Sequence, residues 1–247
     1  MVMARVALIQ VEVSDRESVQ DRVSRVLDLI RLQQHQCDVV VLPELWEVGA
    51  FNTAQYHAHA HPHSGAYIQS LAAAANDANL WLHAGSFIEQ DDDVLYNTTA
   101  LFDPNGDLVT FYRKRHLFGF HEGEASVLAA GEPIVVVADT PVGDVGLSTC
   151  YDLRFPEQFR YMVDLDVHTH MMSASWPTAR LEHWRILNQA RAIENQTWVL
   201  ACNATGVSGG IELAGHSMVI NPKGEIVSQA DCDETVLYAD CLLYTSP

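Results

Sequence analysis

Short apolar runs without alternation recur along the chain and predict buried β-strands. Residues 5–10, 37–43, 145–149 and 197–203 are runs of this kind, and polar or turn-forming residues bound each of them. Strands that are covered on both faces show this pattern, because neither side of such a strand meets water. The pattern therefore predicts an α/β protein in which helices cover the sheets.

Helical periodicity lies between these strands. Residues 19–32 repeat Val, Leu and Ile about every 3.6 positions, and residues 65–78 read as an alanine-rich helix. Ser14 and Glu17 have the spacing of a capping box, which predicts Ser14 as the N-cap of the first helix. Because the chain opens as strand, helix and strand, we expect its first two strands to be neighbours in one sheet.

The middle of the chain predicts a meander, in which consecutive strands pair antiparallel. Residues 80–88, 94–102 and 108–112 are strand-like runs separated by polar turns. Further along, residues 182–195 show helical spacing, which predicts an inward stripe of Trp184, Leu187, Ala190 and Ile193. No shift in composition marks a domain boundary, so we expect residues 1–247 to form a single domain.

Cys150 directly follows the apolar run at residues 145–149, and Pro156 suits the first turn of a helix. A thiol at such a strand-to-helix junction meets free backbone N–H groups and partial positive charge. Both lower the pKa of a thiol and can hold an oxyanion, so Cys150 is a candidate nucleophile. The alternative, which position alone favours, is a small buried apolar residue.

Two further groups follow strand-like runs in the same way. Glu44 ends the run at residues 37–43, where a carboxylate is unfavourable without a partner; an exposed Glu is the alternative. Lys114 is the middle one of three consecutive cations, a pattern that more commonly marks a solvated face, and Glu124 follows as a second acid. A thiol, a base and a cation are the parts of acyl transfer through a thioester.

These groups lie in motifs that resemble the nitrilase, or carbon–nitrogen hydrolase, superfamily. The motifs are Leu-Pro-Glu ending at Glu44, Tyr-Arg-Lys-Arg-His-Leu-Phe around Lys114 and Cys-Tyr-Asp-Leu-Arg-Phe-Pro-Glu from Cys150. Trp176-Pro177, Ala-Arg-Ala-Ile-Glu-Asn at residues 190–195 and Gly-His-Ser-Met at residues 215–218 continue the resemblance over nearly the whole chain. Within the superfamily, the sequence looks most like the omega-amidase branch and related small-amide hydrolases.

The resemblance implies a four-layer α-β-β-α sandwich of the nitrilase type, paired as a homodimer or a higher homo-oligomer. It implies a catalytic triad of Glu44, Lys114 and Cys150, with Glu124 as the second active-site glutamate. The implied reaction is hydrolysis of a small amide to a carboxylate and ammonia through a thioester on Cys150, with no metal and no organic cofactor. The family usually continues into a C-terminal arm, which we expect this chain to lack.

Tyr151, Trp176 and Arg154 are the candidate substrate-binding residues. The free carboxylate of a dicarboxylate monoamide needs a cation, for which Arg154, Arg180 and Arg115 are candidates. A nitrile or an N-carbamoyl amide stays open as the substrate, and a non-catalytic binding protein of the same fold is the alternative from another class. Specificity is expected to lie in the loops at residues 46–52, 118–124 and 176–182.

The composition narrows the range of partners and compartments. The formal net charge of −18 argues against nucleic acid and anionic membrane surfaces as partners, since both are polyanions. No apolar run is long enough to span a bilayer. The five cysteines are odd in number and have no Cys-x-x-Cys or zinc-ribbon spacing, which predicts free thiols in a reducing, cytoplasmic compartment.

The sequence contains two groups of closely spaced histidines. Four histidines alternate at positions 57, 59, 61 and 63, a spacing that could hold zinc or nickel. Because no Cys or acidic ligand accompanies them in the sequence, a solvated loop is the favoured interpretation. His168 and His170 are expected on one face of a strand at residues 166–173, as satisfied core or edge histidines.

Overall fold

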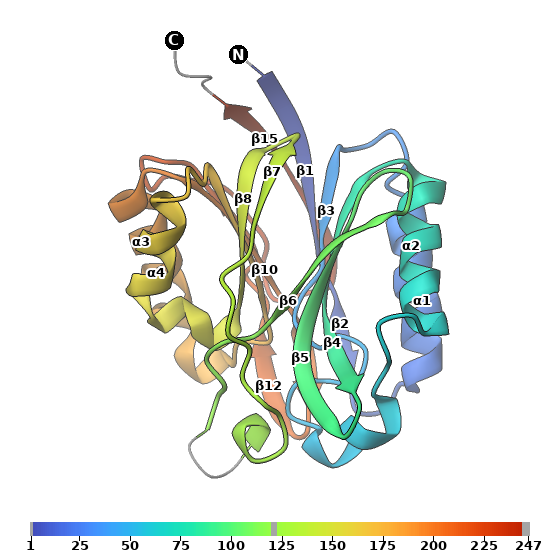
Figure 1. The fold of residues 1–247 in the computed structure, drawn as a ribbon. Helices are drawn as coiled ribbons and strands as arrows, with labels where there is room; N and C mark the ends of the chain where they lie inside the picture. Colours follow the sequence, from blue (N-terminus) through green and yellow to red (C-terminus); the bar gives the residue numbers. More distant parts are fainter. Residues whose placement is uncertain (1, 120–122, 244–247) are drawn as a thin grey trace.

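The computed structural model describes residues 2–119 and 123–243, which form a layered sandwich. Figure 1 shows two β-sheets face to face, with a pair of helices covering the outer side of each sheet. This arrangement confirms the predicted four-layer α-β-β-α fold. The fold follows from the buried strands of the sequence, because each sheet must be covered on both faces.

The first sheet contains β1 (Val2–Gln10), β3 (Val39–Val41), β4 (Trp81–Asp91), β5 (Val94–Phe102), β6 (Leu108–Arg113) and β15 (Thr235–Leu243), and the helices α1 (Val19–Arg31) and α2 (Ala66–Ala78) cover it. Its strand order is β15-β1-β3-β4-β5-β6. β1 and β3 are parallel neighbours, which confirms the predicted opening of the chain. β4, β5 and β6 pair antiparallel, which confirms the predicted meander.

The second sheet contains β7 (Val136–Thr140), β8 (Gly143–Thr149), β9 (Thr169–Ala174), β10 (Trp198–Asn203), β13 (Met218–Ile220) and β14 (Ile226–Gln229). Its order is β14-β13-β10-β9-β8-β7, and α3 (Pro156–Val163) and α4 (Leu181–Asn195) cover it. A small third sheet joins β2 (Glu12–Ser14), β11 (Thr205–Ser208) and β12 (Ile211–Ala214). β2, β11 and β12 were not predicted from the sequence, because strands of three or four residues are too short to show a period.

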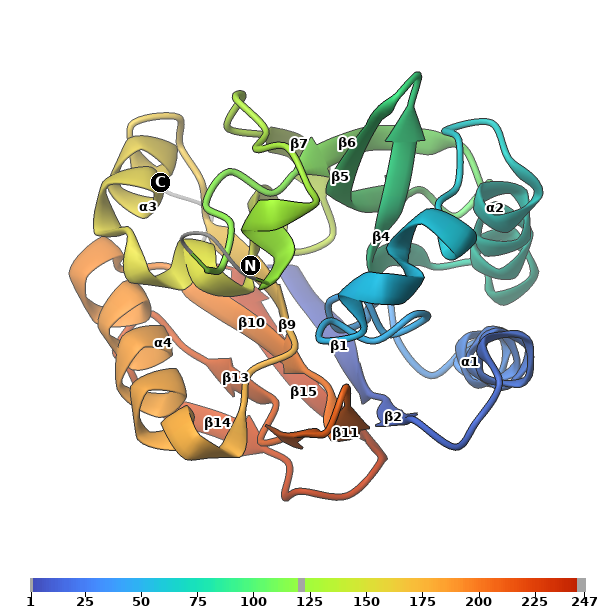
Figure 2. The same ribbon diagram turned by 90° about the horizontal axis from the view of Figure 1, so that it is seen from below.

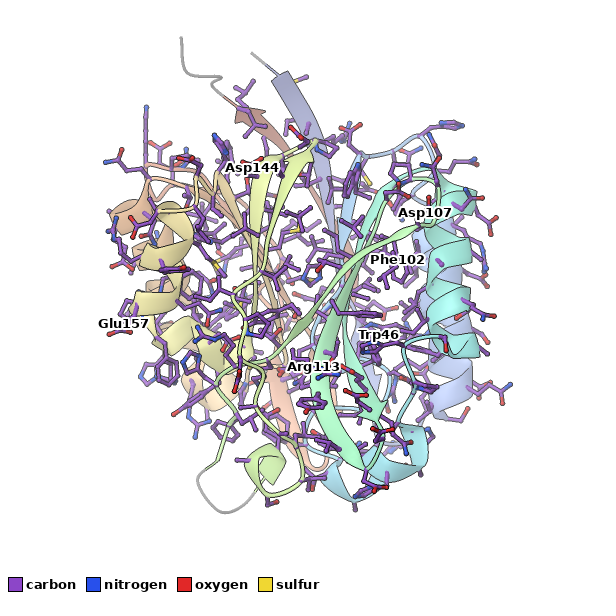
Figure 3. All side chains as sticks on the ribbon, viewed as in Figure 1. Trp46, Phe102, Asp107, Arg113, Asp144 and Glu157 are labelled. Atoms are coloured by element: carbon purple, nitrogen blue, oxygen red, sulfur yellow. The ribbon has the colours of Figure 1, made fainter. Side chains whose placement is uncertain are left out.

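Alternation along β1 separates two layers of the core. Ala4, Val6 and Leu8 belong to the cluster between the sheets, together with Val145 and Leu147 of β8. The residues of β1 that point the other way pack against α1 and α2. Figure 3 shows this dense packing: Phe102 lies among the side chains between the first sheet and α2, whereas Glu157 projects outward from α3.

The strand directions bring several strand ends together. β6 runs parallel to β3 and β4, because two antiparallel pairings separate it from β4. In the second sheet, β8 and β9 are also parallel to each other. A hydrogen bond of 3.3 Å from the backbone N–H of Glu44, after β3, to the carbonyl of Ala174, in β9, joins the two sheets at this end. Figure 2 looks onto this end, where η1 (Thr53–His59) and η2 (Gly123–Ser126) lie.

The first helix begins later than the sequence predicted. Its N-cap is Ser18, not Ser14, which belongs to β2 and pairs with β11. The predicted capping box is wrong because the Glu17 carboxylate instead forms ion pairs of 2.9 Å with Arg22 and with Arg25.

The inward face of α4 is also different from the predicted stripe. Ile193 is 55% exposed, whereas Asn188, Arg191 and Asn195 are buried beside Trp184. Arg191 donates a hydrogen bond of 2.6 Å to the carbonyl of Leu153, which holds its charged group inside. The spacing of apolar residues could not predict the inward face of α4, because polar side chains with internal hydrogen-bond partners form much of that face.

The alternating histidines divide into two kinds. His57 is exposed and His59 is partly exposed, as in a solvated loop. His61 and His63 instead contact the buried carboxylates of Glu47 and Glu89, and the His61 Nε2 to Glu47 Oε1 distance is 2.7 Å. The solvated-loop prediction is therefore wrong for His61, which pairs with a buried carboxylate, whereas His63 contacts Glu89 with 43% of its side chain still exposed. Across the described ranges, no group of three or more His, Cys, Asp or Glu side chains is placed to hold a metal ion.

His168 and His170 have different surroundings, and only His168, whose Nδ1 accepts a hydrogen bond of 3.4 Å from the backbone N–H of Asp144, fits the expected satisfied histidine. His168 is exposed and precedes β9, whereas His170 is fully buried with its ring 5.0 Å from that of Phe159. Within the described part of the chain, neither ring nitrogen of His170 has a hydrogen-bond partner, so the prediction of a satisfied core histidine is wrong. Burial, together with the charge of Arg191, lowers the pKa of His170 to about 3.

All five cysteines are free thiols. None of the helices in the described ranges is long and apolar enough to cross a membrane. Cys202 and Cys241 lie in the core between the sheets, where burial raises the pKa of Cys202 above its usual range and that of Cys241 to about 12. Thiols in this state behave as small apolar side chains.

We predict that replacing His170 reduces the acid sensitivity of the fold. The ordinary pKa of 6.5 applies to the unfolded chain and a pKa of about 3 to the folded one. Between these pH values only the unfolded state binds the proton, so stability is lost as the pH falls. His170→Leu should flatten the dependence of the unfolding free energy on pH by up to roughly 1.4 kcal/mol per pH unit. Urea unfolding between pH 4 and pH 7 measures this slope. The control His168→Leu should leave the slope unchanged, and equal slopes for the two variants would refute the prediction.

Candidate active site

Glu44 lies at the meeting point of the two sheets and is 2% exposed. Its Oε1 atom accepts hydrogen bonds from Lys114 Nζ at 2.7 Å and from Asn97 Nδ2 at 2.9 Å. Its Oε2 atom accepts from the backbone N–H of Ser175 at 2.9 Å. The partner that the sequence analysis required for this carboxylate is therefore Lys114, which follows β6.

Lys114 links the two glutamates. Its ammonium group donates to Oε1 of Glu124 as well as to Glu44, and Lys114 is 1% exposed. Glu124 also accepts a hydrogen bond of 2.6 Å from the backbone N–H of Phe118. The alternative in which Lys114 belongs to a solvated face is therefore wrong.

Asn97 and Ser175 complete this cluster, and the sequence analysis missed both. Asn97, in β5, donates to Glu44 and, at 3.3 Å, to Glu124, so one amide group binds both carboxylates. The hydroxyl of Ser175 donates to the backbone carbonyl of Glu44 at 2.7 Å. The signal for Asn97 was a buried polar residue within the strand run Leu-Tyr-Asn-Thr-Thr, because such a residue needs internal partners.

Cys150 lies where β8 ends and the short helix η3 (Cys150–Arg154) begins. Its backbone φ is 48°, in the left-handed region that non-glycine residues rarely adopt. A capping box between Thr149 and Asp152 holds this turn. Strained turns of this kind are characteristic of functional sites, and here the turn places Cys150 in the wall of a cavity.

The electrostatics of Cys150 differ from the sequence prediction. Burial and the neighbouring Glu44 carboxylate raise the pKa of the thiol well above its usual range, although Lys114 acts in the opposite direction. The strand-to-helix junction alone predicted a lowered pKa, because the nearby carboxylates come from distant parts of the chain. The resting nucleophile is therefore a protonated thiol, and it needs a base.

The charges of the other two groups follow from their mutual contacts. Burial works to lower the pKa of Lys114, but the carboxylates of Glu124 and Glu44 raise it well above its usual value. Burial and the Glu44 charge raise the pKa of Glu124, and Lys114 opposes that rise. The lysine is therefore a fixed positive charge at neutral pH.

A single cavity brings the predicted site residues together. It encloses about 660 Å³, part of it open to solvent, and Glu44, Lys114, Glu124 and Cys150 all line it. Six further lining residues are aromatic or cationic: Phe51, Phe118, Tyr151, Trp176, Arg154 and Arg180. The three predicted substrate-binding residues thus share the cavity of the predicted triad.

Arg154 is held at this cavity by aromatic rings. Its guanidinium carbon lies 5.0 Å from the ring centroid of Trp176 and 5.8 Å from that of Tyr151. Its Nη2 atom lies 3.2 Å from Nδ1 of His183. Arg115, the third candidate cation, does not line this cavity; its guanidinium lies 3.4 Å from Gln158 Oε1.

The three predicted specificity loops all contribute to the cavity. Phe51, Phe118 and Arg180 come one from each of the loops at residues 46–52, 118–124 and 176–182. Residues 120–122 of the second loop lie outside the described residues. Neither Phe51 nor Phe118 was predicted to bind substrate, because a single Phe in a loop does not by itself indicate such a role.

The wall of the cavity holds a thiol, a neighbouring carboxylate and a buried ammonium. This arrangement is typical of a hydrolase that acts through a covalent acyl intermediate. The fold and this site together define that class of enzyme.

The chain belongs to the carbon–nitrogen hydrolase family, whose sequence profile matches residues 5–245. Over 241 residues it is 42% identical to the 2-oxoglutaramate amidase of Paenarthrobacter nicotinovorans. This alignment covers 95% of this chain and 82% of the relative. It is 32% identical over 245 residues to omega-amidase NIT2 of Mus musculus. This second alignment covers 96% of this chain and 87% of the relative.

The crystal structure of Saccharomyces cerevisiae Nit3, a member of branch 10 of the nitrilase superfamily, is similar with a TM-score of 0.88. The identity is 30%, and the match covers 97% of this chain and 90% of Nit3. These similarities confirm the resemblance and the nitrilase-type sandwich. The protein is accordingly a hydrolase of carbon–nitrogen bonds other than peptide bonds.

We predict that Glu44→Gln makes the Cys150 thiol more acidic while it stops turnover. The Glu44 carboxylate raises the pKa of the thiol, so its replacement by a neutral amide lowers that pKa. The rate of Cys150 alkylation by iodoacetamide, measured against pH, should therefore reach its midpoint at a lower pH. Ammonia release should fall by at least about 100-fold, because general-base catalysis is lost. A midpoint that stays unchanged or moves to higher pH would contradict this account.

Proposed function

We propose that this enzyme hydrolyses the ω-amide of a short dicarboxylate monoamide. The observation that carries the proposal is the presence of Arg154 in the same cavity as Cys150. A guanidinium can bind a carboxylate through two parallel hydrogen bonds, and so can orient the far end of such a substrate. The amide at the other end would then face the thiol.

The relatives support this substrate class. One is named a 2-oxoglutaramate amidase and another an omega-amidase, and both names describe hydrolysis of a terminal amide. The cavity agrees in character, because its wall combines aromatic faces with two arginines, Arg154 and Arg180. An apolar wall suits the methylene chain of the substrate, and a cation suits its free carboxylate.

The proposed mechanism begins with proton transfer from Cys150 to Glu44 as the sulfur attacks the amide carbon. The carbonyl oxygen becomes an oxyanion, which Lys114 and the backbone N–H of Tyr151 stabilise. The protonated Glu44 then gives its proton to the amide nitrogen. The carbon–nitrogen bond breaks, ammonia leaves, and the acyl group stays on Cys150 as a thioester.

Water completes the cycle in the second half. Glu44 takes a proton from a water molecule, with Glu124 helping to orient it, and the hydroxide attacks the thioester. The carbon–sulfur bond breaks, and the Glu44 proton returns to the sulfur. The product leaves as a carboxylic acid, which gives its proton to water and becomes the carboxylate. The raised pKa of Lys114 supports its role throughout, since the ammonium keeps its charge.

We predict that Arg154→Met selectively impairs dicarboxylate monoamides. Loss of charge-assisted hydrogen bonds should raise KM for these substrates about 10- to 100-fold, with little change for neutral amides. Arg115→Met is the matched control, because Arg115 lies outside the cavity, and it should leave KM unchanged. The measurement is ammonia release from monoamides, neutral amides, nitriles and N-carbamoyl amides.

Cys150→Ala is included in the same assay and should stay folded without turnover. If Arg154→Met loses equal activity on neutral and on carboxylated amides, Arg154 does not bind the substrate carboxylate. Faster release from nitriles or N-carbamoyl amides than from any monoamide would move the substrate class to one of those compounds.

We also propose a homodimer or higher homo-oligomer, as the resemblance implied. The outer face of α3 and α4 supports it, because Tyr161, Ile186 and Ile193 are large apolar residues with exposed side chains on these two helices, and the exposed Leu165 lies just after α3. The net charge of −18 supports the absence of nucleic-acid and membrane partners, and the five free cysteines support a cytoplasmic compartment.

We predict that the double variant Ile186→Glu/Ile193→Glu reduces the molar mass measured by light scattering to that of one chain. Charges on both residues would be buried without partners in a paired face. Leu32→Glu is the control, because Leu32 is 70% exposed at the end of α1, on the other side of the sandwich. If the unmodified protein has the molar mass of a single chain, the proposal of a homo-oligomer is wrong.

A further inference from the structure

Asp152, two residues after Cys150, is fully buried, accepts three hydrogen bonds and has a fourth hydrogen-bond contact with the ring of His116. Its Oδ2 atom accepts from the backbone N–H of Thr149 at 2.9 Å and from the hydroxyl of Tyr112 at 2.6 Å. Its Oδ1 atom accepts from the backbone N–H of His116 at 3.0 Å and lies 2.7 Å from His116 Nδ1. One carboxylate therefore contacts two segments of chain that are distant in the sequence.

The two segments are those that carry Cys150 and Lys114. Thr149 immediately precedes Cys150, whereas Tyr112 and His116 stand two residues before and two residues after Lys114. Asp152 thus ties the turn of the nucleophile to both sides of the lysine. Burial and the Asp152 charge raise the pKa of Tyr112 well above 10, so its hydroxyl keeps the proton that it donates.

The chemistry of this contact requires a carboxylate. At least three of the four atoms around Asp152 belong to donors, and Nδ1 of His116 also donates when it carries its hydrogen. An ionised carboxylate has acceptor sites for all four, whereas an amide of the same shape would direct its own N–H groups at one pair of donors. The ring of His116 is further held by stacking on Phe155, with centroids 3.7 Å apart.

We propose that Asp152 is a positioning residue that sets the place of the Cys150 thiol relative to the Lys114 ammonium. The proposal rests on the roles proposed above for Cys150 and Lys114. Asp152 touches neither substrate nor the reacting atoms. Its effect falls on the chemical step, because oxyanion stabilisation depends on donor placement within a few tenths of an ångström.

The first test is Asp152→Asn. We expect kcat to fall about 10- to 100-fold, as when one oxyanion donor is misplaced, while KM changes less than kcat. Lys114 lowers the pKa of the Cys150 thiol, so a thiol displaced from the lysine should be alkylated by iodoacetamide with a midpoint at higher pH. An unchanged kcat and an unchanged alkylation profile would overturn the proposal, whatever happens to the melting temperature.

The second test separates positioning from simple capping of the turn. The double variant Tyr112→Phe/His116→Gln keeps the bond from Thr149 to Asp152 but removes two side-chain donors from the lysine segment. We expect the same loss of kcat and the same alkylation shift as in Asp152→Asn. If the double variant matches the unmodified enzyme, Asp152 only caps the turn and the proposal fails.

Two further variants serve as controls. His116→Asn can place an amide N–H where Nδ1 lies and should retain more activity than His116→Gln, although both lose the stacked ring. Gln158→Met removes a bond of 3.0 Å to the Tyr112 hydroxyl without touching Asp152, and it should leave kcat unchanged. Equal activities of His116→Asn and His116→Gln would contradict a role for Nδ1.

The alkylation arm does not depend on the substrate. If the enzyme proves to act on a nitrile or an N-carbamoyl amide, the ω-amide proposal fails, but the alkylation profile of Asp152→Asn still tests the position of the thiol. If Cys150→Ala retains turnover, the roles on which both proposals rest fail together.

Discussion

The structure depends on one buried ammonium shared by two buried carboxylates. Lys114 contacts Glu44 and Glu124, and all three side chains are at most 5% exposed. A charge in such a place is unfavourable by several kcal/mol unless partners surround it, and removal of one partner from a buried pair destabilises a protein by roughly 3–5 kcal/mol. The cluster exists because three different chain segments supply its members.

These segments can meet only because of the strand directions. Glu44 follows β3, Lys114 follows β6 and Cys150 follows β8, and these strands end on the same side of the sandwich. The two sheets are joined there by contacts between Glu44 and the residues at the end of β9. The cavity therefore lies where rigid strand ends, rather than mobile loops, hold the reacting groups, and the loops are left to provide its aromatic wall.

The electrostatics of the cluster explain how the nucleophile is controlled. In the resting site, burial and the Glu44 charge keep the thiol of Cys150 protonated. In the proposed mechanism the sulfur becomes a strong nucleophile only as its proton moves to Glu44. An uncompensated thiolate would react with many electrophiles, whereas a thiol activated in step with attack reacts only when a substrate is in place. In the proposed mechanism the lysine, whose charge is fixed by the two carboxylates, stabilises the oxyanion that forms at the same moment.

The sequence by itself determined most of the strands and helices, the meander and the three candidate catalytic residues, because burial patterns and family motifs are local along the chain. It did not determine the cap of α1, the polar inward face of α4 or the partners of His61 and His63, since each depends on charged groups from distant segments. For the same reason it misjudged the pKa of Cys150, which depends on Glu44 more than one hundred residues away. The tertiary structure alone decided that Asn97 and Ser175 complete the site and that Arg154, and not Arg115, faces the cavity. Which side chains meet depends on strand order and direction, and no local pattern encodes them.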